Sequence, residues 1–215
     1  MRVQLLVLAK TPVPGRVKTR LCPPCTPEQA AQVAAAALAD TLDAVAATPC
    51  AARTLVVDGG HPAPAGWGRV AQRGESLGDR LACAYADTFV PGTPSLLIGM
   101  DTPQISPALL ASAANRLGAA STDAVLGPAE DGGWWALGLR DPRHAKVLRW
   151  VPTSLPDTGR LTLAALRASG LRVAALPALR DVDVAADAHA VAELCPHDNR
   201  FPRVVSAVVP SVAAA

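Results

Sequence analysis

The chain has 215 residues, a formal net charge of +2 and 50% hydrophobic residues, a composition that excludes an intrinsically disordered protein. The near-neutral balance excludes a nucleic-acid-binding surface spread over the whole molecule. The longest apolar-rich segment, about residues 29–47, contains Asp40 and Asp43, so we expect no membrane-spanning helix. The first residues are typical of a strand and not of a signal peptide, so we expect a cytoplasmic protein.

Strands and helices alternate along the predicted chain. In order, we expect a strand at 2–8, a helix from Thr26 to about residue 47, strands at 54–57 and near Val70, a helix over about 77–89 and a strand at 95–99. A helix then opens at Ser106-Pro107, followed by strands at 123–127 and 134–139, a helix near 159–169, a strand near 171–176 and a helix over about 184–194. Thr or Ser followed by Pro is a typical helix start.

This alternation predicts an α/β protein whose central sheet is mostly parallel and covered by helices on both faces. Several of the expected strands are apolar throughout, as strands buried on both faces are. In such sheets ligands bind at the carboxyl ends of the strands. Polar motifs follow the first strand, the strand at 95–99 and the strand at 123–127, so we expect a ligand site at this edge.

The loop after the first strand is basic. Lys10, Arg16, Lys18 and Arg20 lie within eleven residues, around Gly15. Gly15 allows the backbone to turn closely around a ligand, and the cations pair with phosphate oxygens. The loop matches neither the P-loop nor the dinucleotide-binding motif. A di- or triphosphate site is the favoured interpretation, and a solvated basic loop is the alternative.

Two acidic motifs are candidates for metal binding. Asp101 lies at the end of the apolar strand at 95–99, after Met100, and is expected to project into the cleft. A hard cation binds one or two carboxylates there together with substrate phosphates. Asp181 and Asp183 lie on one side of an extended segment, and Asp183 is the better candidate for a second metal ligand. The alternative for Asp101 is a role in a turn or a helix cap. Asp187 follows in the same segment, in the first turn of the last expected helix, where an acidic side chain is favourable without any ligand.

The turn Glu130-Asp131-Gly132-Gly133 combines two acids with two glycines and precedes Trp134-Trp135. A tight turn between strands explains the glycines, whereas a ligand site explains why acids and indoles bracket them. Both interpretations stay open.

Residues 72–80 are a weaker candidate. Gln72 and the glycines of this stretch have the groups to hydrogen-bond a nucleobase, but a capped helix start explains it equally well. Cys22 and Cys25 form a CxxC pair without a second Cys/His pair at metal spacing, and we expect no function from it. Motifs for covalent catalysis are not found.

The motifs AK-x-P-x-PG-R-x-KTRL, Q-R-G-x-x-LGDR, GMDTP, LGPAEDGGWWALGL and LRDVD occur in this order. Together they resemble the nucleotide-diphospho-sugar transferase-like proteins known as DUF2064, over about residues 3–195. The resemblance implies a three-layer GT-A (Rossmann-like) fold, shared with molybdenum-cofactor and phospholactate guanylyltransferases. It implies one nucleotide-binding transferase domain over residues 1–200, and we assign 201–215 to a C-terminal tail.

The resemblance also implies roles for individual residues. Phosphates would be held by Gly15, Arg16, Lys18 and Arg20. Gln72 and Gly78 would lie near the base, Asp101 and Asp183 would bind Mg²⁺ or Mn²⁺, and the Asp131-Gly132-Gly133 turn would face the second substrate. We take Lys18, Asp101 and Asp131 as the candidate catalytic residues.

The predicted function is nucleotidyl transfer from an NTP to a small phosphorylated acceptor, with release of pyrophosphate. Such a reaction needs positive charge on the outer phosphates and a metal on the reacting one. Transfer of a sugar from a nucleotide-sugar is the first alternative, and a non-catalytic nucleotide-binding protein is the second. We expect no nucleic acid and no membrane as partner, and a homodimer is left open.

Overall fold

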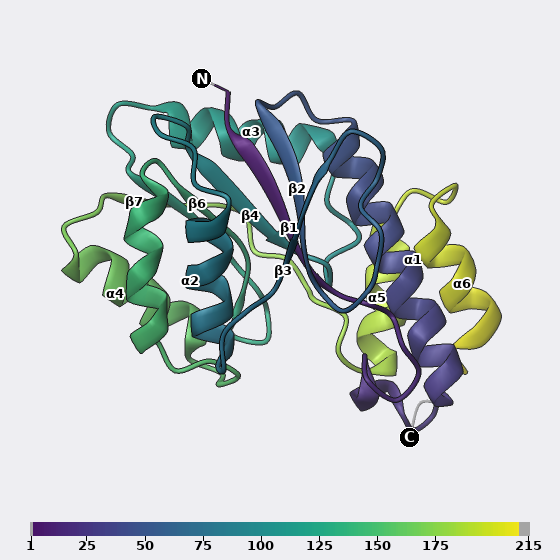
Figure 1. Ribbon diagram of the computed structural model, residues 1–215. Helices are drawn as coiled ribbons and strands as arrows, with labels where there is room; N and C mark the ends of the chain where they lie inside the picture. Colours follow the sequence, from purple (N-terminus) through teal and green to yellow (C-terminus); the bar gives the residue numbers. More distant parts are fainter. Residues whose placement is uncertain (1, 211–215) are drawn as a thin grey trace.

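A seven-stranded sheet with the strand order β3-β2-β1-β4-β6-β5-β7 forms the centre of the structure (Figure 1). The computed structural model describes residues 2–210. The strands are β1 (Gln4–Lys10), β2 (Ala52–Asp58), β3 (Gly68–Ala71), β4 (Ser95–Gly99), β5 (Ala124–Pro128), β6 (Trp134–Leu139) and β7 (Val173–Ala175). Only β6 runs antiparallel to its neighbours β4 and β5, and every other pairing is parallel. The predicted mostly parallel α/β sheet is confirmed.

Helices follow most of the strands, and several begin where the sequence predicts. The helices are α1 (Pro27–Ala46), α2 (Leu77–Asp87), α3 (Pro107–Gly118), α4 (Thr158–Ala168), α5 (Ala185–Leu194) and α6 (Arg200–Val208), with 3-10 segments η1 (Thr19–Leu21) and η2 (Pro142–Trp150). The Oγ1 atom of Thr26 accepts a hydrogen bond from the Gln29 backbone N–H at 3.3 Å, and Ser106 caps α3 in the same way. Among residues 2–210, no helix combines the length and the apolar character needed to cross a membrane.

Side chains of alternating strand residues pack into two different cores, one on each face of the sheet. Leu5 and Val7 of β1 face a core that includes residues of α1 and α3. Leu6, between them, faces the core formed with α2, η2 and α4. Figure 1 shows α2 and α4 on one side of the sheet and α1 with α5 and α6 on the other. The expected three-layer arrangement is therefore present.

Helix α1 is buried along two faces, because α5 and α6 cover the side that does not pack on the sheet. Val33 and Ala37 belong to a third apolar cluster, together with residues of α5 and α6 such as Val191 and Phe201. Part of the segment assigned to a tail, 201–215, therefore lies in a packed helix, and residues 211–215 lie outside the described part of the chain.

The carboxyl ends of the six parallel strands meet at one edge of the sheet, which faces downward in Figure 1. Strand β1 pairs with β2 on one side and with β4 on the other. The loops after β1 and β4 therefore lead away from adjacent strand ends, and the crevice between such loops is the usual ligand position in open α/β sheets.

The buried carboxylate of Asp40 in α1 holds the start of α6. Asp40 is 5% exposed and accepts hydrogen bonds from the backbone N–H groups of Phe201 at 2.7 Å and Arg200 at 3.1 Å. These two N–H groups would otherwise lack a partner at the helix N-terminus.

Replacing Asp40 by Ala is expected to lower the free energy of unfolding by about 1–3 kcal/mol, since buried donors lose their acceptor. Urea denaturation measures the change. The matched control is Asp43→Ala, because the Asp43 side chain is 66% exposed and also pairs with Arg200, so its loss should cost less than about 1 kcal/mol. Equal losses in the two variants would contradict the buried capping role.

Candidate functional site

The loop between β1 and η1 carries the basic motif to the carboxyl edge of the sheet. Gly15 has a φ angle of +73°, and a side chain there would meet no atom within 4 Å, so the backbone is open to solvent at this point. Arg16 is exposed, and within residues 2–210 its guanidinium has no ion-pair partner. Arg20 is also exposed but pairs with Asp183. The loop thus presents cationic groups to an incoming anion.

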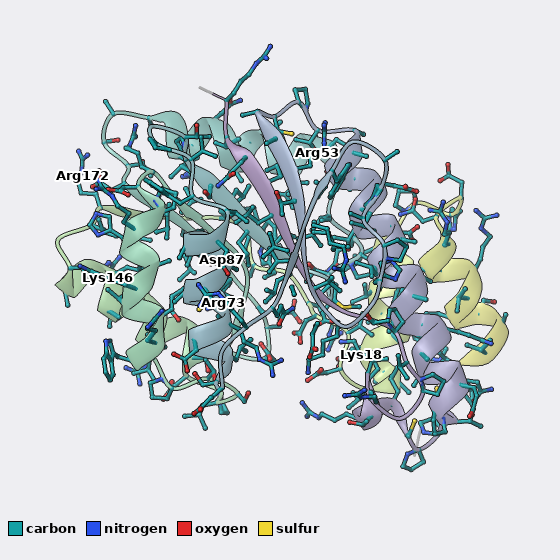
Figure 2. The ribbon with its side chains drawn as sticks, viewed as in Figure 1. Lys18, Arg53, Arg73, Asp87, Lys146 and Arg172 are labelled. Atoms are coloured by element: carbon teal, nitrogen blue, oxygen red, sulfur yellow. The ribbon has the colours of Figure 1, made fainter. Side chains whose placement is uncertain are left out.

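Lys18 does not belong to a solvated surface loop. Its side chain is only 8% exposed, and its Nζ atom lies 2.6 Å from Oδ1 of Asp101 and 4.0 Å from Oδ1 of Asp183. Nζ also donates a hydrogen bond to the carbonyl oxygen of Val182. Figure 2 shows Lys18 below the strand ends, beside α5. One buried ammonium therefore joins the loop after β1, the loop after β4 and the segment before α5.

Asp101 lies in the crevice that the topology creates, two residues after the end of β4. Its backbone carbonyl accepts a hydrogen bond from Val182 N–H at 3.0 Å, which fixes the two segments against each other. Its side chain is 47% exposed and forms an ion pair with Lys18. The structure thus brings Lys18, Asp101 and Asp183 together, although 164 residues separate Lys18 from Val182 in the sequence.

A second acidic group overlaps with this arrangement. Asp131, Asp181 and Asp183 each offer a carboxylate oxygen, and these oxygens lie within 4.8 Å of one another. Burial, followed by the negative charges of Asp131 and Asp183, raises the pKa of Asp181 to about 6, while Lys18 offsets part of the rise. Carboxylates that crowd in this way are stabilised by a hard cation, so the three form a candidate metal-binding triad.

The predicted metal pair and the observed triad share Asp183 and differ in their other members. The sequence interpretation pairs Asp183 with Asp101, whereas the structure gathers Asp183 with Asp181 and Asp131. The sequence predicts Asp181 and Asp183 on one side of an extended segment. It does not predict that Asp131, on the β5–β6 turn, lies close to them, because this contact joins segments distant in the chain.

The Asp131-Gly132-Gly133 turn needs its glycines for close packing. Gly132 has a φ angle of +89°, and a Cβ atom there would lie 1.7 Å from the carbonyl oxygen of Pro156. Oδ1 of Asp131 accepts a hydrogen bond from Gly133 N–H at 2.7 Å. The tight-turn interpretation therefore accounts for the glycines, and the same turn holds Asp131 in the acidic triad.

Gln72 and Gly78 have structural roles in the chain. The Nε2 atom of Gln72 donates hydrogen bonds to the carbonyl oxygens of Ala9 at 2.7 Å and Val56 at 3.3 Å, so it ties the ends of β1 and β2 to the end of β3. A Cβ atom on Gly78 would lie 2.4 Å from the carbonyl oxygen of Leu148. Close packing explains Gly78, and a nucleobase contact by either residue stays a prediction.

Arg180 is a residue of this region that the sequence reasoning missed. Its Nε atom lies 3.5 Å from Glu130 and 3.3 Å from Asp187. Asp187 in turn accepts hydrogen bonds from the backbone N–H groups of Asp183 and Val184 at 3.2 and 3.0 Å. It therefore stabilises the start of α5, as the helix-start interpretation of Asp187 predicts. The available signal was the position of Arg180 directly before the acidic segment.

One thiol of the CxxC pair, Cys25, lies in an environment that disfavours the reactive thiolate. Cys22 and Cys25 are free thiols and Cys25 is buried. Burial is the main cause that raises the pKa of the Cys25 thiol, and a raised pKa keeps a thiol protonated and unreactive.

The fold is similar to those of several solved structures. A candidate nucleotide-diphospho-sugar transferase from Desulfovibrio desulfuricans G20 shares 25% sequence identity and a TM-score of 0.84, over 96% of this chain and 95% of that one. A CMP:2-keto-3-deoxy-manno-octonic acid synthetase complexed with CTP has 12% identity and a TM-score of 0.55, over 86% and 95%. Rv0371c from Mycobacterium tuberculosis H37Rv, in complex with manganese, has 20% identity and a TM-score of 0.53, over 97% and 100%. The last two show a common fold only.

These neighbours include nucleotide-using enzymes by name, which is consistent with the transferase expected from the sequence. No curated protein matches the chain. A family model described as "Uncharacterized protein conserved in bacteria (DUF2064)" matches residues 30–155. More than half of the sequence is covered by this match, and the chain belongs to the DUF2064 family.

Proposed function

We propose that this protein is a metal-dependent nucleotidyltransferase, which moves an NMP group from an NTP to a small phosphorylated acceptor. The observation that carries the proposal is the meeting of opposite charges at the β1–β4 crevice. Lys18 and the exposed Arg16 come from the loop after β1, and the carboxylates of Asp101 and Asp183 face Lys18. This arrangement suits a triphosphate that binds together with a divalent cation.

The chemical step needs a cationic group for the leaving pyrophosphate. A phosphate oxygen of the acceptor forms a bond to the α-phosphorus of the NTP, and the bond between that phosphorus and the α–β bridging oxygen breaks. The electron pair leaves with pyrophosphate. Lys18 and Arg16 would pair with its oxygens and stabilise the charge as it develops.

The residues that would hold the metal include Asp183 in either arrangement, with Asp181 and Asp131 or with Asp101. All four are carboxylates, which suit Mg²⁺ and Mn²⁺ alike. The bound ion would supply positive charge to the α-phosphate. The manganese in the Rv0371c structure makes Mn²⁺ the first ion to test and Mg²⁺ the second.

Sugar transfer from a nucleotide-diphospho-sugar is the second candidate function. It is favoured by the Desulfovibrio structure, which is similar over nearly the whole chain. The donor in sugar transfer carries a diphosphate, whereas the donor in nucleotidyl transfer carries a triphosphate with more negative charge. The dense basic loop therefore favours nucleotidyl transfer. A non-catalytic nucleotide-binding protein is disfavoured because the acidic triad is present.

A cytoplasmic location is also part of the proposal, since the five cysteines are free and thiols persist in a reducing compartment. A homodimer stays a prediction.

Thermal-shift measurements distinguish the two transferase functions. The purified chain is heated with ATP, CTP, GTP or UTP, and in parallel with UDP-glucose or GDP-mannose, each with and without Mn²⁺. We expect at least one NTP to raise the melting temperature in a Mn²⁺-dependent manner, because a ligand that binds only the folded state stabilises it. Pyrophosphate release in the presence of that NTP and candidate phosphorylated acceptors then reports on the reaction.

The Asp198→Asn variant serves as a reference protein, because it neutralises an exposed carboxylate outside the site. It should respond to the NTP as the native chain does. Stabilisation by a nucleotide-sugar but by none of the four NTPs would replace nucleotidyl transfer by sugar transfer.

A further inference from the structure

A pocket of about 290 Å³ lies between α2 and η2, on the face of the sheet that these elements cover. Helix α2 lines it with one stripe of side chains, because residues spaced i, i+3, i+4 and i+7 share a helix face. These residues are Ala82, Tyr85, Ala86 and Phe89. None of the lining residues belongs to the proposed active site, so the pocket is a separate feature of the molecule.

The wall formed by η2 carries a row of cations. Arg143, Lys146 and Arg149 are exposed and all line the pocket. A 3-10 helix has about three residues per turn, so side chains three positions apart lie directly above one another. The spacing of the basic residues therefore places them in one row, while Ala145 and Leu148 are buried in the core that η2 shares with α2. Figure 2 shows Lys146 on the side of the sheet that α2 covers.

The chain neutralises only part of this positive charge. Arg143 forms an ion pair with Asp141 at 2.7 Å, and its guanidinium carbon lies 5.9 Å from the centroid of the Phe89 ring. Within residues 2–210, Lys146 and Arg149 have no ion-pair partner. Like charges one helical turn apart destabilise a helix, so the folding of η2 does not explain the row. A bound anion would offset the repulsion.

Arg149 extends from η2 toward α2, since its Nη2 atom donates a hydrogen bond to Sγ of Cys83 at 3.9 Å. Hydrogen bonds from Ser76 are the main cause that lowers the pKa of Asp79, and the charge of Arg149 adds the smallest contribution. A sulfur atom is a weak acceptor, and Asp79 is a distant partner. The charge of Arg149 is therefore available to a ligand in the pocket.

The two walls of the pocket are held in place by contacts within the chain. A Cβ atom on Gly78 would lie 2.4 Å from the carbonyl oxygen of Leu148, so η2 packs closely against the start of α2. The hydroxyl of Tyr85 donates a hydrogen bond to the Leu137 carbonyl at 2.5 Å, which fixes the position of its ring. A pocket that is formed before the ligand arrives lowers the ordering cost of binding.

We propose that the α2–η2 pocket binds a small organic acid. Its anionic group pairs with Lys146 and Arg149, and its apolar body packs on Ala86 and on Phe89, which is 37% exposed. The volume is close to the lower end of the range of about 300–1,000 Å³ that is typical of small-molecule pockets, which favours a small molecule over a protein segment. The assignment holds whichever group the active site transfers.

The test separates the contribution of the charge from that of the apolar body. Dissociation constants of 2-naphthoate, acetate and 2-naphthylmethylamine are measured with the full chain by ligand-observed NMR. Acetate keeps the negative charge without the ring system, and the amine keeps the ring system with a positive charge. We expect 2-naphthoate to bind at least about tenfold more tightly than either, because only this probe satisfies both walls.

Two kinds of variant locate the binding site. The Lys146→Gln, Arg149→Gln double variant removes the available cations, and Ala86→Glu places a carboxylate and a larger side chain in the pocket. All three positions are exposed, so both variants should fold, and circular dichroism verifies this. Each should weaken 2-naphthoate binding by about tenfold or more.

The matched control is the Arg116→Gln, Arg167→Gln double variant, which removes two exposed cations from α3 and α4 and should bind 2-naphthoate as the native chain does. An NTP with Mn²⁺ should leave this binding unchanged. Displacement of 2-naphthoate by the NTP would place the acid in the active site and overturn the proposal. So would native-like affinity in the Lys146→Gln, Arg149→Gln variant, or an affinity for the amine or for acetate that equals the affinity for 2-naphthoate, since the row would then be a solvated charged face only.

Discussion

Replacement of Asp183 by Asn is expected to weaken Mn²⁺ binding about 100-fold and to lower metal-dependent turnover at least as much. Asp183 is the one carboxylate common to both candidate metal sites, next to Asp101 through Lys18 and next to Asp131 and Asp181 in the triad. Asn keeps the size of the side chain but removes its charge and one strong oxygen ligand. Titration of Mn²⁺ followed by electron paramagnetic resonance measures the affinity directly.

The Asp198→Asn variant controls for the loss of one negative charge, and its Mn²⁺ affinity should match that of the native chain. Native-like affinity in Asp183→Asn would remove Asp183 from the metal site. Two further variants then assign its partners. A loss in Asp181→Asn with retention in Asp101→Asn places the ion in the triad, whereas the reverse places it between Asp101 and Asp183.

The fold was predictable because its determinants are local. The helix starts at Thr26 and Ser106 follow from capping residues that act within three positions of the chain. The β1 and β4 strands follow from short apolar runs, and burial on both faces follows from their uniform composition. Helix α6 was not predicted, because its N-terminal N–H groups are satisfied by Asp40, about 160 residues earlier in the chain.

The candidate site was predictable in its parts and not in its pairings. The rule that ligands bind at the carboxyl ends of parallel strands pointed to the loops that carry Lys18 and Asp101, but the adjacency of β1 and β4 is known only from the structure. The direct contact between Lys18 and Asp101 depends on side-chain geometry and on the Val182 carbonyl, a backbone group that no sequence motif reports. Asp131 joined the acidic triad for the same reason, since only the folded β5–β6 turn brings it to Asp181.

Glycines were the least reliable indicators of a ligand. Gly132 is required by the Pro156 carbonyl and Gly78 by the Leu148 carbonyl. Both close contacts involve backbone that is remote in the sequence. A glycine is required whether a ligand or another part of the chain packs against it, so the sequence alone does not distinguish the two. Gly15 differs, because nothing lies within 4 Å of its missing side chain, and open space beside a basic loop is what a phosphate site needs.

Replacement of Lys18 by Met is expected to weaken NTP binding about 100-fold while NMP binding changes only a few-fold. The buried ammonium lies 2.6 Å from Asp101, and an NTP would bring its outer phosphates to this cation, whereas an NMP has no outer phosphates. Met retains the length of the side chain and removes its charge. Calorimetric titration with an NTP and with the matching NMP, both with Mn²⁺, measures the two losses, and circular dichroism verifies that the variant is folded.

Arg20→Met is the comparison variant for Lys18→Met, because Arg20 is a cation of the same loop whose side chain is 71% exposed. A charge in water attracts an anion less strongly than a desolvated one, so we expect this variant to lose less NTP affinity than Lys18→Met does. Equal losses for NTP and NMP in Lys18→Met would show that Lys18 organises the acidic groups without contacting the outer phosphates. A desolvated cation attracts an anion more strongly than a cation in water does. If Arg20→Met lost as much NTP affinity as Lys18→Met, burial would therefore not be the reason that Lys18 binds the NTP.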